Sequence, residues 1–138
     1  AWQTDCGAGI SGRRTFDIAR GWKDGHPIDA PIFVLTHEAP NQGEWSPQVS
    51  FVTEGIDRAL ALAQEAAGDR YVSLSGADVA RQVLRAGKVD EIEVSLTPCL
   101  LGGGVRLFDN LGDEPIDLEQ IGVIESEGVT HLRYRVVR

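Results

Sequence analysis

Two neighbouring arginines lie in the run Ser11-Gly12-Arg13-Arg14-Thr15, which is interpreted as standing between the end of a strand and a short helix. Free backbone N–H groups at the start of a helix bind phosphate oxygens, and arginine or hydroxyl side chains there add further donors. The run is therefore a candidate phosphate site. In the alternative interpretation Arg13 and Arg14 form a solvated surface and Gly12 only makes a turn. These residues alone do not separate the two interpretations.

Two further runs have a similar character, and each follows an apolar segment. Thr36 and His37 come after 31–35, where a hydroxyl and an imidazole can contact a ribose or a phosphate, although an ordinary loop histidine is the simpler explanation. The run Ser75-Gly76-Ala77-Asp78 follows 71–74. Its small residues would let the backbone approach a pyrophosphate, or they would simply make a tight turn. The run is not G-x-G-x-x-G, so the standard dinucleotide fingerprint is absent.

A triple glycine is the most unusual segment of the chain. Gly102, Gly103 and Gly104 are consecutive, and ordering each of them costs more backbone entropy than ordering any other residue. The folded protein must therefore need them, either for the close approach of a ligand or for packing against a facing strand.

Other chemistries find little support in the spacing of reactive residues. His26, His37 and His131 do not have the spacing of metal ligands, so we expect no zinc site. Cys6 and Cys99 are far apart and are interpreted as unpaired thiols of a reducing compartment. No catalytic triad can be argued from spacing, and the catalytic residues stay unassigned.

The composition is that of one globular domain. The chain has 138 residues, of which 42% are apolar and 25% charged. Its net charge of −8 argues against a general nucleic-acid binder, although a local basic pocket can still hold an anionic cofactor. No apolar run reaches the length of a membrane span and no secretory signal is visible, so we expect a cytoplasmic protein with no membrane partner.

The elements that must position these runs follow from the apolar patterning. The segment 1–9 is short and of mixed composition. It is interpreted as the end of a structural element rather than as the start of a fold. The alternation of strands and helices predicts an α/β domain with a mostly parallel sheet, helices on both faces and a C-terminal antiparallel hairpin. Ligands bind such sheets beyond the carboxyl ends of the strands. The expected elements are a helix at 13–19, strands at 31–36 and 49–52, a helix at 56–67 capped by Thr53, a strand at 71–75, a helix at 77–86, a strand at 91–96, and hairpin strands at about 116–126 and 129–137.

Several of these segments together resemble one family. The segments are Gly12-Arg13-Arg14-Thr15-Phe16, Pro31–Thr36, Ser75–Ala80, Val89–Ile92 and Pro98–Gly104 with Leu107-Phe108. In this order they are similar to the C-terminal reductase domain of the bifunctional riboflavin-biosynthesis deaminase-reductase and its stand-alone bacterial relatives. The resemblance covers nearly the whole chain. It implies a single dihydrofolate-reductase-like domain over 1–138, with three α/β/α layers.

The resemblance also implies NADPH as cofactor and a homodimer as the assembled form. The expected reaction is hydride transfer to a small heterocyclic substrate, either a pyrimidine of riboflavin biosynthesis or a related C=N or C=O compound. The implied cofactor contacts are Gly12, Arg13, Arg14 and Thr15 at the phosphates, Thr36 and His37 near the adenosine 2′-phosphate, Ser75, Gly76, Ala77 and Asp78 at the pyrophosphate, and Gly102, Gly103 and Gly104 beside the nicotinamide and the substrate.

Two departures from the family pattern bear on activity. Ser75 stands where relatives usually have glycine, which leaves the backbone less freedom. The N-terminal strand and the Asp-Gly loop that hold substrate in relatives have no counterpart in this chain, so the proton donor cannot be named. The alternative is a non-catalytic protein that binds a nucleotide or another small molecule on the same scaffold.

Overall fold

The computed structural model describes residues 5–138, and it divides the chain after Gln82 into two compact units. The first unit contains a parallel sheet with its helices, and the second contains an antiparallel sheet. None of the helices within 5–138 is long and apolar enough to cross a membrane.

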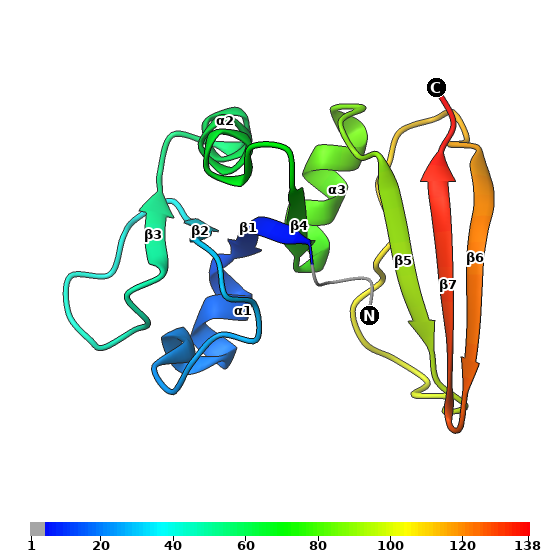
Figure 1. Cartoon of the computed structure of the whole chain (residues 1–138), viewed down its shortest axis with the longest axis horizontal. Helices are drawn as coiled ribbons and strands as arrows, with labels where there is room; N and C mark the ends of the chain where they lie inside the picture. The colour runs from blue at the N-terminus through cyan, green and yellow to red at the C-terminus, as the bar shows by residue number, and fades with distance from the viewer. Residues whose placement is uncertain (1–4) are drawn as a thin grey trace. The chain divides into compact units, whose positions relative to one another are not determined.

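The first unit is built on four parallel strands (Figure 1). They lie in the order β3-β2-β1-β4, with β1 in the interior of the sheet between β2 and β4. The predicted parallel sheet is thus confirmed. The strands are β1 (Cys6–Gly12), β2 (Ile32–Leu35), β3 (Val49–Val52) and β4 (Tyr71–Ser75).

The helices of this unit are α1 (Arg13–Ile18) and α2 (Ile56–Ala67), with a 3₁₀ helix η1 at Arg20–Trp22. A third helix, α3 (Ala77–Arg85), begins in this unit, and the division after Gln82 falls within it. Figure 1 shows α1 and α2 on opposite faces of the sheet. The bounds of α2 agree with its apolar periodicity, because its regularly spaced small and apolar side chains are buried. The predicted cap at Thr53 is wrong. Gly55 occupies the N-cap with a φ of 96°, a left-handed conformation that favours glycine, and no side chain caps the helix.

Strand β1 corrects the interpretation of the segment 1–9. Residues 1–4 lie outside the described residues, but residues 6–9 belong to a buried central strand. The pattern hid this strand because cysteine, alanine and glycine lack the branched side chains typical of strands. Gly7 has a packing reason to be small, since a Cβ added there would lie 2.7 Å from the Ala67 Cα of α2.

The core under α1 determines where the start of that helix lies. Phe16 is buried against Ile32 and Val34 of β2 and Val49 of β3. Three half-buried rings surround it, and the nearest, Phe51, meets it edge-on with 5.2 Å between centroids. Anchoring Phe16 in this way fixes α1 over β2 and β3, and therefore fixes Arg13 beside the end of β2.

The turn after α1 has an unusual backbone. Arg20, Gly21 and Trp22 all have left-handed φ angles, of 53°, 67° and 50°. Gly21 must be small, because a Cβ there would lie 2.7 Å from the Cβ of Trp45. The Gly21 carbonyl also accepts a hydrogen bond of 2.9 Å from the Ser46 N–H. The turn is thus fixed against the loop that precedes β3.

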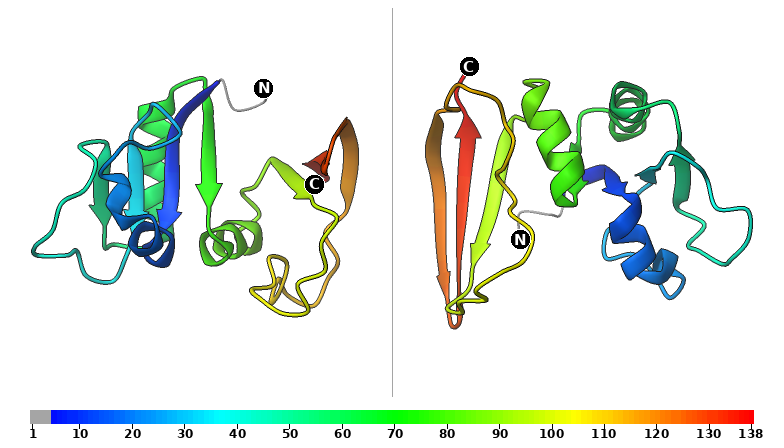
Figure 2. Two further views of the ribbon diagram at one scale, coloured as in Figure 1. Left: turned by 90° about the horizontal axis from the view of Figure 1, so that it is seen from below. Right: turned by 180° about the vertical axis from the view of Figure 1, so that it is seen from behind.

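The second unit holds three antiparallel strands, β5 (Glu91–Leu96), β6 (Leu118–Ser126) and β7 (Val129–Val136). The predicted hairpin is confirmed, with β6 and β7 joined by the turn at Glu127-Gly128. Strand β5 pairs with β7, which places β7 in the centre (Figure 2). Ion pairs cross the sheet on both sides of β7, from Arg133 to Glu91 and from Arg135 to Glu119.

Candidate functional site

The parallel sheet brings three of the predicted runs to one edge. Ser11 of β1 lies opposite Val34 of β2 on one side and opposite Ser75 of β4 on the other. All three strands run in the same direction, so their carboxyl ends meet. Three runs therefore begin at the ends of neighbouring strands, namely 11–15, 36–37 and 75–78.

A small cradle lies where two of these runs meet. Gly76 has a φ of 98°, and a Cβ added to it would lie 3.0 Å from the Thr15 Oγ1 and 3.7 Å from the Gly12 nitrogen. The Thr15 side chain is half-buried, and its hydroxyl has no hydrogen-bond partner within residues 5–138. Gly76 also immediately precedes α3, whose first N–H groups carry the positive end of the helix dipole. These groups suit a phosphate oxygen, and a side chain at position 76 would fill their space.

Arg13 connects α1 to the end of β2. Its Nη1 donates to the Thr36 Oγ1 at 3.1 Å and to the Glu38 carbonyl at 2.7 Å. Its Nε donates to the Asp17 Oδ1 at 3.0 Å, one helical turn further along α1. The Thr36 hydroxyl in turn donates to the Glu38 carbonyl. The first run and the Thr36 run are thus joined by direct hydrogen bonds.

The other predicted residues at this edge differ in their surroundings. Arg14 and His37 are exposed, and neither has a hydrogen bond or ion pair within the described part of the chain. Asp78 lies in the first turn of α3 and accepts a hydrogen bond of 2.8 Å from the Gln82 Nε2. Since a carboxylate is favourable at the start of a helix, Asp78 has a structural explanation. Ala77 begins the helix, and its carbonyl accepts from the Arg81 Nε.

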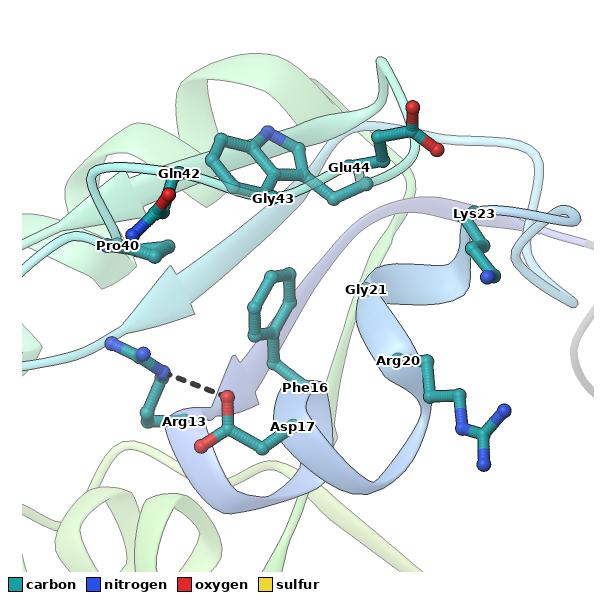
Figure 3. A pocket seen from close by; sticks show the side chains of 11 residues that line it. Arg13, Phe16, Asp17, Arg20, Gly21, Lys23, Pro40, Gln42, Gly43 and Glu44 are labelled. Atoms are coloured by element: carbon teal, nitrogen blue, oxygen red, sulfur yellow. Dashed lines mark hydrogen bonds and ion pairs between the residues drawn. The ribbon is translucent and has the colours of Figure 1, made fainter.

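A cavity of about 400 Å³, lined in part by Arg13, lies between α1 and the loop at 40–45 (Figure 3). Phe16 stands at its centre, above the ion pair of Arg13 with Asp17, and Arg20 and Lys23 lie along one side. The sequence analysis does not predict this cavity. Its walls come from segments that are far apart in the chain, so no local pattern indicates it.

The triple glycine belongs to the second unit. Gly102, Gly103 and Gly104 lie in the loop between β5 and β6 and are exposed. Gly102 and Gly104 have φ angles of 73° and 126°, which explains why these two positions need glycine. Their contact with a cofactor stays a prediction.

One histidine near the turn after α1 has a shifted pKa. His26 packs edge-on against Trp22, with 4.5 Å between ring centroids. Its Nδ1 accepts a hydrogen bond of 3.0 Å from the Ile28 N–H. Burial lowers the pKa of His26 below its usual value of 6.5. Within the described residues, no cluster of three or more histidine, cysteine or acidic side chains could hold a metal ion.

The fold and the shared strand edge define an α/β domain of the dihydrofolate-reductase-like class. A family model described as the RibD C-terminal domain matches residues 24–132, and the chain belongs to this family. Comparison with curated protein sequences gives no match.

Solved structures agree with this assignment. A putative riboflavin biosynthesis protein from Shewanella sp. PV-4 is 25% identical with a TM-score of 0.77, and the match covers 96% of this chain and 75% of that one. RibD from Acinetobacter baumannii is 20% identical with a TM-score of 0.69, and the match covers 99% of this chain. The chain spans 48% of that RibD, about half its length. The riboflavin biosynthesis reductase Rib7 of Saccharomyces cerevisiae is 14% identical with a TM-score of 0.63, at 98% and 77% coverage.

Proposed function

We propose that this chain is an NADPH-binding reductase domain that transfers hydride to a small heterocyclic substrate. The substrate would be a pyrimidine of riboflavin biosynthesis or a related C=N or C=O compound. The observation that carries the proposal is the cradle formed by the Gly12 nitrogen, the Thr15 hydroxyl and Gly76. Membership of the RibD C-terminal domain family supports the same reading.

The residues present fit a dinucleotide phosphate. The Thr15 hydroxyl would donate to a phosphate oxygen, and the start of α3 would stabilise its charge. Arg14 would add an unpaired positive charge at the same edge. Thr36 and His37, beyond the end of β2, would lie on the side of the adenosine 2′-phosphate, where the guanidinium of Arg13 is already in place.

When bound, NADPH supplies the hydride, and the protein supplies position and electrostatics. The groups at the strand ends would hold the phosphates and so orient the rest of the cofactor. No residue within 5–138 is assigned as the proton donor.

The first experiment is a calorimetric titration of the protein with NADPH, with NADH as the control. We expect NADPH to bind more tightly, because the cationic and hydroxyl groups beyond β2 would contact its 2′-phosphate. Absence of binding at millimolar concentrations of either cofactor would refute the proposal.

The cradle itself is tested by Gly76→Ala. The new Cβ meets the Thr15 hydroxyl at 3.0 Å and lies where a phosphate oxygen would sit, so we expect NADPH affinity to fall at least about tenfold. Gly55→Ala is the matched control. Gly55 has nearly the same φ, of 96°, but a Cβ there meets nothing within 4 Å, so it carries the backbone strain without the steric block. Equal affinities of the two variants would place the phosphates elsewhere.

The second candidate is a non-catalytic binding protein on the same scaffold. Ser75 favours it, because this residue replaces a glycine usual in the family at the end of β4. The two functions differ in turnover. A reductase consumes NADPH when it is given 5-amino-6-(5-phosphoribosylamino)uracil or a related substrate, whereas a binding protein retains NADPH affinity and consumes none.

A further inference from the structure

Three protein acceptors hold the Arg13 guanidinium. They are the Asp17 Oδ1 at 3.0 Å from Nε, and the Thr36 Oγ1 and the Glu38 carbonyl at 3.1 and 2.7 Å from Nη1. Arginine has five N–H donors, and the two on Nη2 have no partner within residues 5–138. The guanidinium is therefore already oriented, and one nitrogen is left for a further acceptor.

The other two acceptors already orient the Arg13 guanidinium, so Asp17 adds little to its orientation. Thr36 and Glu38 hold Nη1 from the segment just beyond β2, and both acceptors are uncharged. Asp17 holds Nε from one turn along α1 and differs from them in bringing a full negative charge.

The ion pair also contributes little to stability. The side chains of Arg13 and Asp17 are 37% and 55% exposed, and they are four residues apart on a short helix. Exposed pairs of this kind have small net effects on folding, because solvent screens them and ordering both side chains costs entropy. The carboxylate still acts on any third charge brought within a few ångströms of Arg13, since charges at that range are screened only partly.

We propose that Asp17 is a specificity-determining residue that limits the affinity of Arg13 for the 2′-phosphate of NADPH. Its carboxylate partly neutralises the guanidinium and repels the incoming phosphate, while the two uncharged acceptors keep Arg13 in place. NADH has no 2′-phosphate, so its affinity is almost independent of Asp17. Asp17 thereby lowers the preference for NADPH and keeps this cofactor readily exchangeable. The inference rests on the proposed function, which places the 2′-phosphate beside Thr36 and Arg13.

The test is a titration of the wild type and Asp17→Asn with NADPH and with NADH. Asparagine keeps an oxygen that can accept from the Arg13 Nε but removes the charge. We expect NADPH to bind about three- to tenfold more tightly at low ionic strength, NADH to change little, and the gain to shrink at about 0.5 M salt. Asp69→Asn is the matched control, because it makes the same change in net charge in the turn before β4, at the opposite edge of the sheet. We expect it to leave both affinities unchanged.

The outcomes separate this inference from the proposed function. An unchanged ratio of NADPH to NADH affinity in Asp17→Asn, with NADPH-selective binding in the wild type, overturns the role of Asp17 and leaves the proposed function standing. Weaker binding of both cofactors, together with a lower melting temperature, shows that Asp17 is structural and also overturns the inference. If the wild type binds neither cofactor, the proposed function fails and the inference fails with it.

Discussion

At the scale of single residues, His26 makes stability depend on pH. Its ring packs against Trp22, and burial lowers its pKa relative to the unfolded chain, where the value is 6.5. Below about pH 6.5, His26 therefore becomes protonated in the unfolded chain while it is still neutral in the folded protein. The contribution of His26 to the free energy of unfolding is complete above this pH and is lost as the pH falls towards its folded pKa.

We therefore predict that the free energy of unfolding decreases between pH 7 and pH 5, and that His26→Asn reduces the slope. Asparagine keeps an acceptor near the position of Nδ1, so the hydrogen bond from the Ile28 N–H can persist without a titrating ring. Urea denaturation at a series of pH values measures the effect. Parallel slopes for the wild type and the variant would show that His26 does not carry this dependence.

At the scale of elements, the contact of β1 with α2 leaves no room for a side chain. A Cβ on Gly7 would lie 2.7 Å from the Ala67 Cα and 2.9 Å from the Ala67 carbonyl oxygen, both of them backbone atoms that cannot move alone. We predict that Gly7→Ala lowers the free energy of unfolding by about 1–3 kcal/mol, as expected for overpacking in a core.

Urea denaturation of Gly7→Ala beside Gly103→Ala tests this prediction. Gly103 has an ordinary φ and open space around its would-be Cβ, so alanine there is expected to leave stability nearly unchanged. A Gly7→Ala protein as stable as the Gly103→Ala protein would mean that α2 can shift away from β1 at little cost.

The same contact shows what the sequence could and could not predict about the fold. Strand β2 is predictable because it is an apolar run bounded by turn residues. Helix α2 is predictable because its apolar residues recur at the helical period. Residues 6–9 of β1 are not predictable in this way, because the contacts that require glycine there are made with later parts of the chain. Gly7 packs against Ala67 of α2, and Gly9 packs against Ile32 of β2.

The candidate site, too, could be predicted from the sequence only in part. The three runs at the strand ends could be predicted to share an edge, because parallel strands place their carboxyl ends together. The hydrogen bonds of Arg13 to Thr36 and Glu38 could not, since they depend on the path of the chain just after β2. The cavity beside Phe16 depends likewise on the loop at 40–45.

At the scale of the whole molecule, the resemblance to the reductase family predicts a homodimer assembled through the late strands. The second unit offers a physical reason, because Val94, Leu132 and Val123 lie opposite one another across its three strands and form an apolar row. We expect light scattering coupled to size-exclusion chromatography to give twice the 14.9 kDa of one chain. A mass of 14.9 kDa at micromolar concentration would contradict the prediction.

The central place of β1 also has a consequence for synthesis on the ribosome. Ser11 of β1 pairs with Ser75 of β4, so at about 5–20 residues per second β1 waits roughly 3–13 s for this partner. The strands of the β6–β7 hairpin, in contrast, follow one another at once. During that time β2 can already pair with one side of β1, but the other side stays open. A branched, strongly apolar strand with such an open side would invite aggregation, which glycine-rich segments resist. Gly7, which lets α2 approach β1 in the finished protein, therefore also helps to protect the nascent chain while it is incomplete.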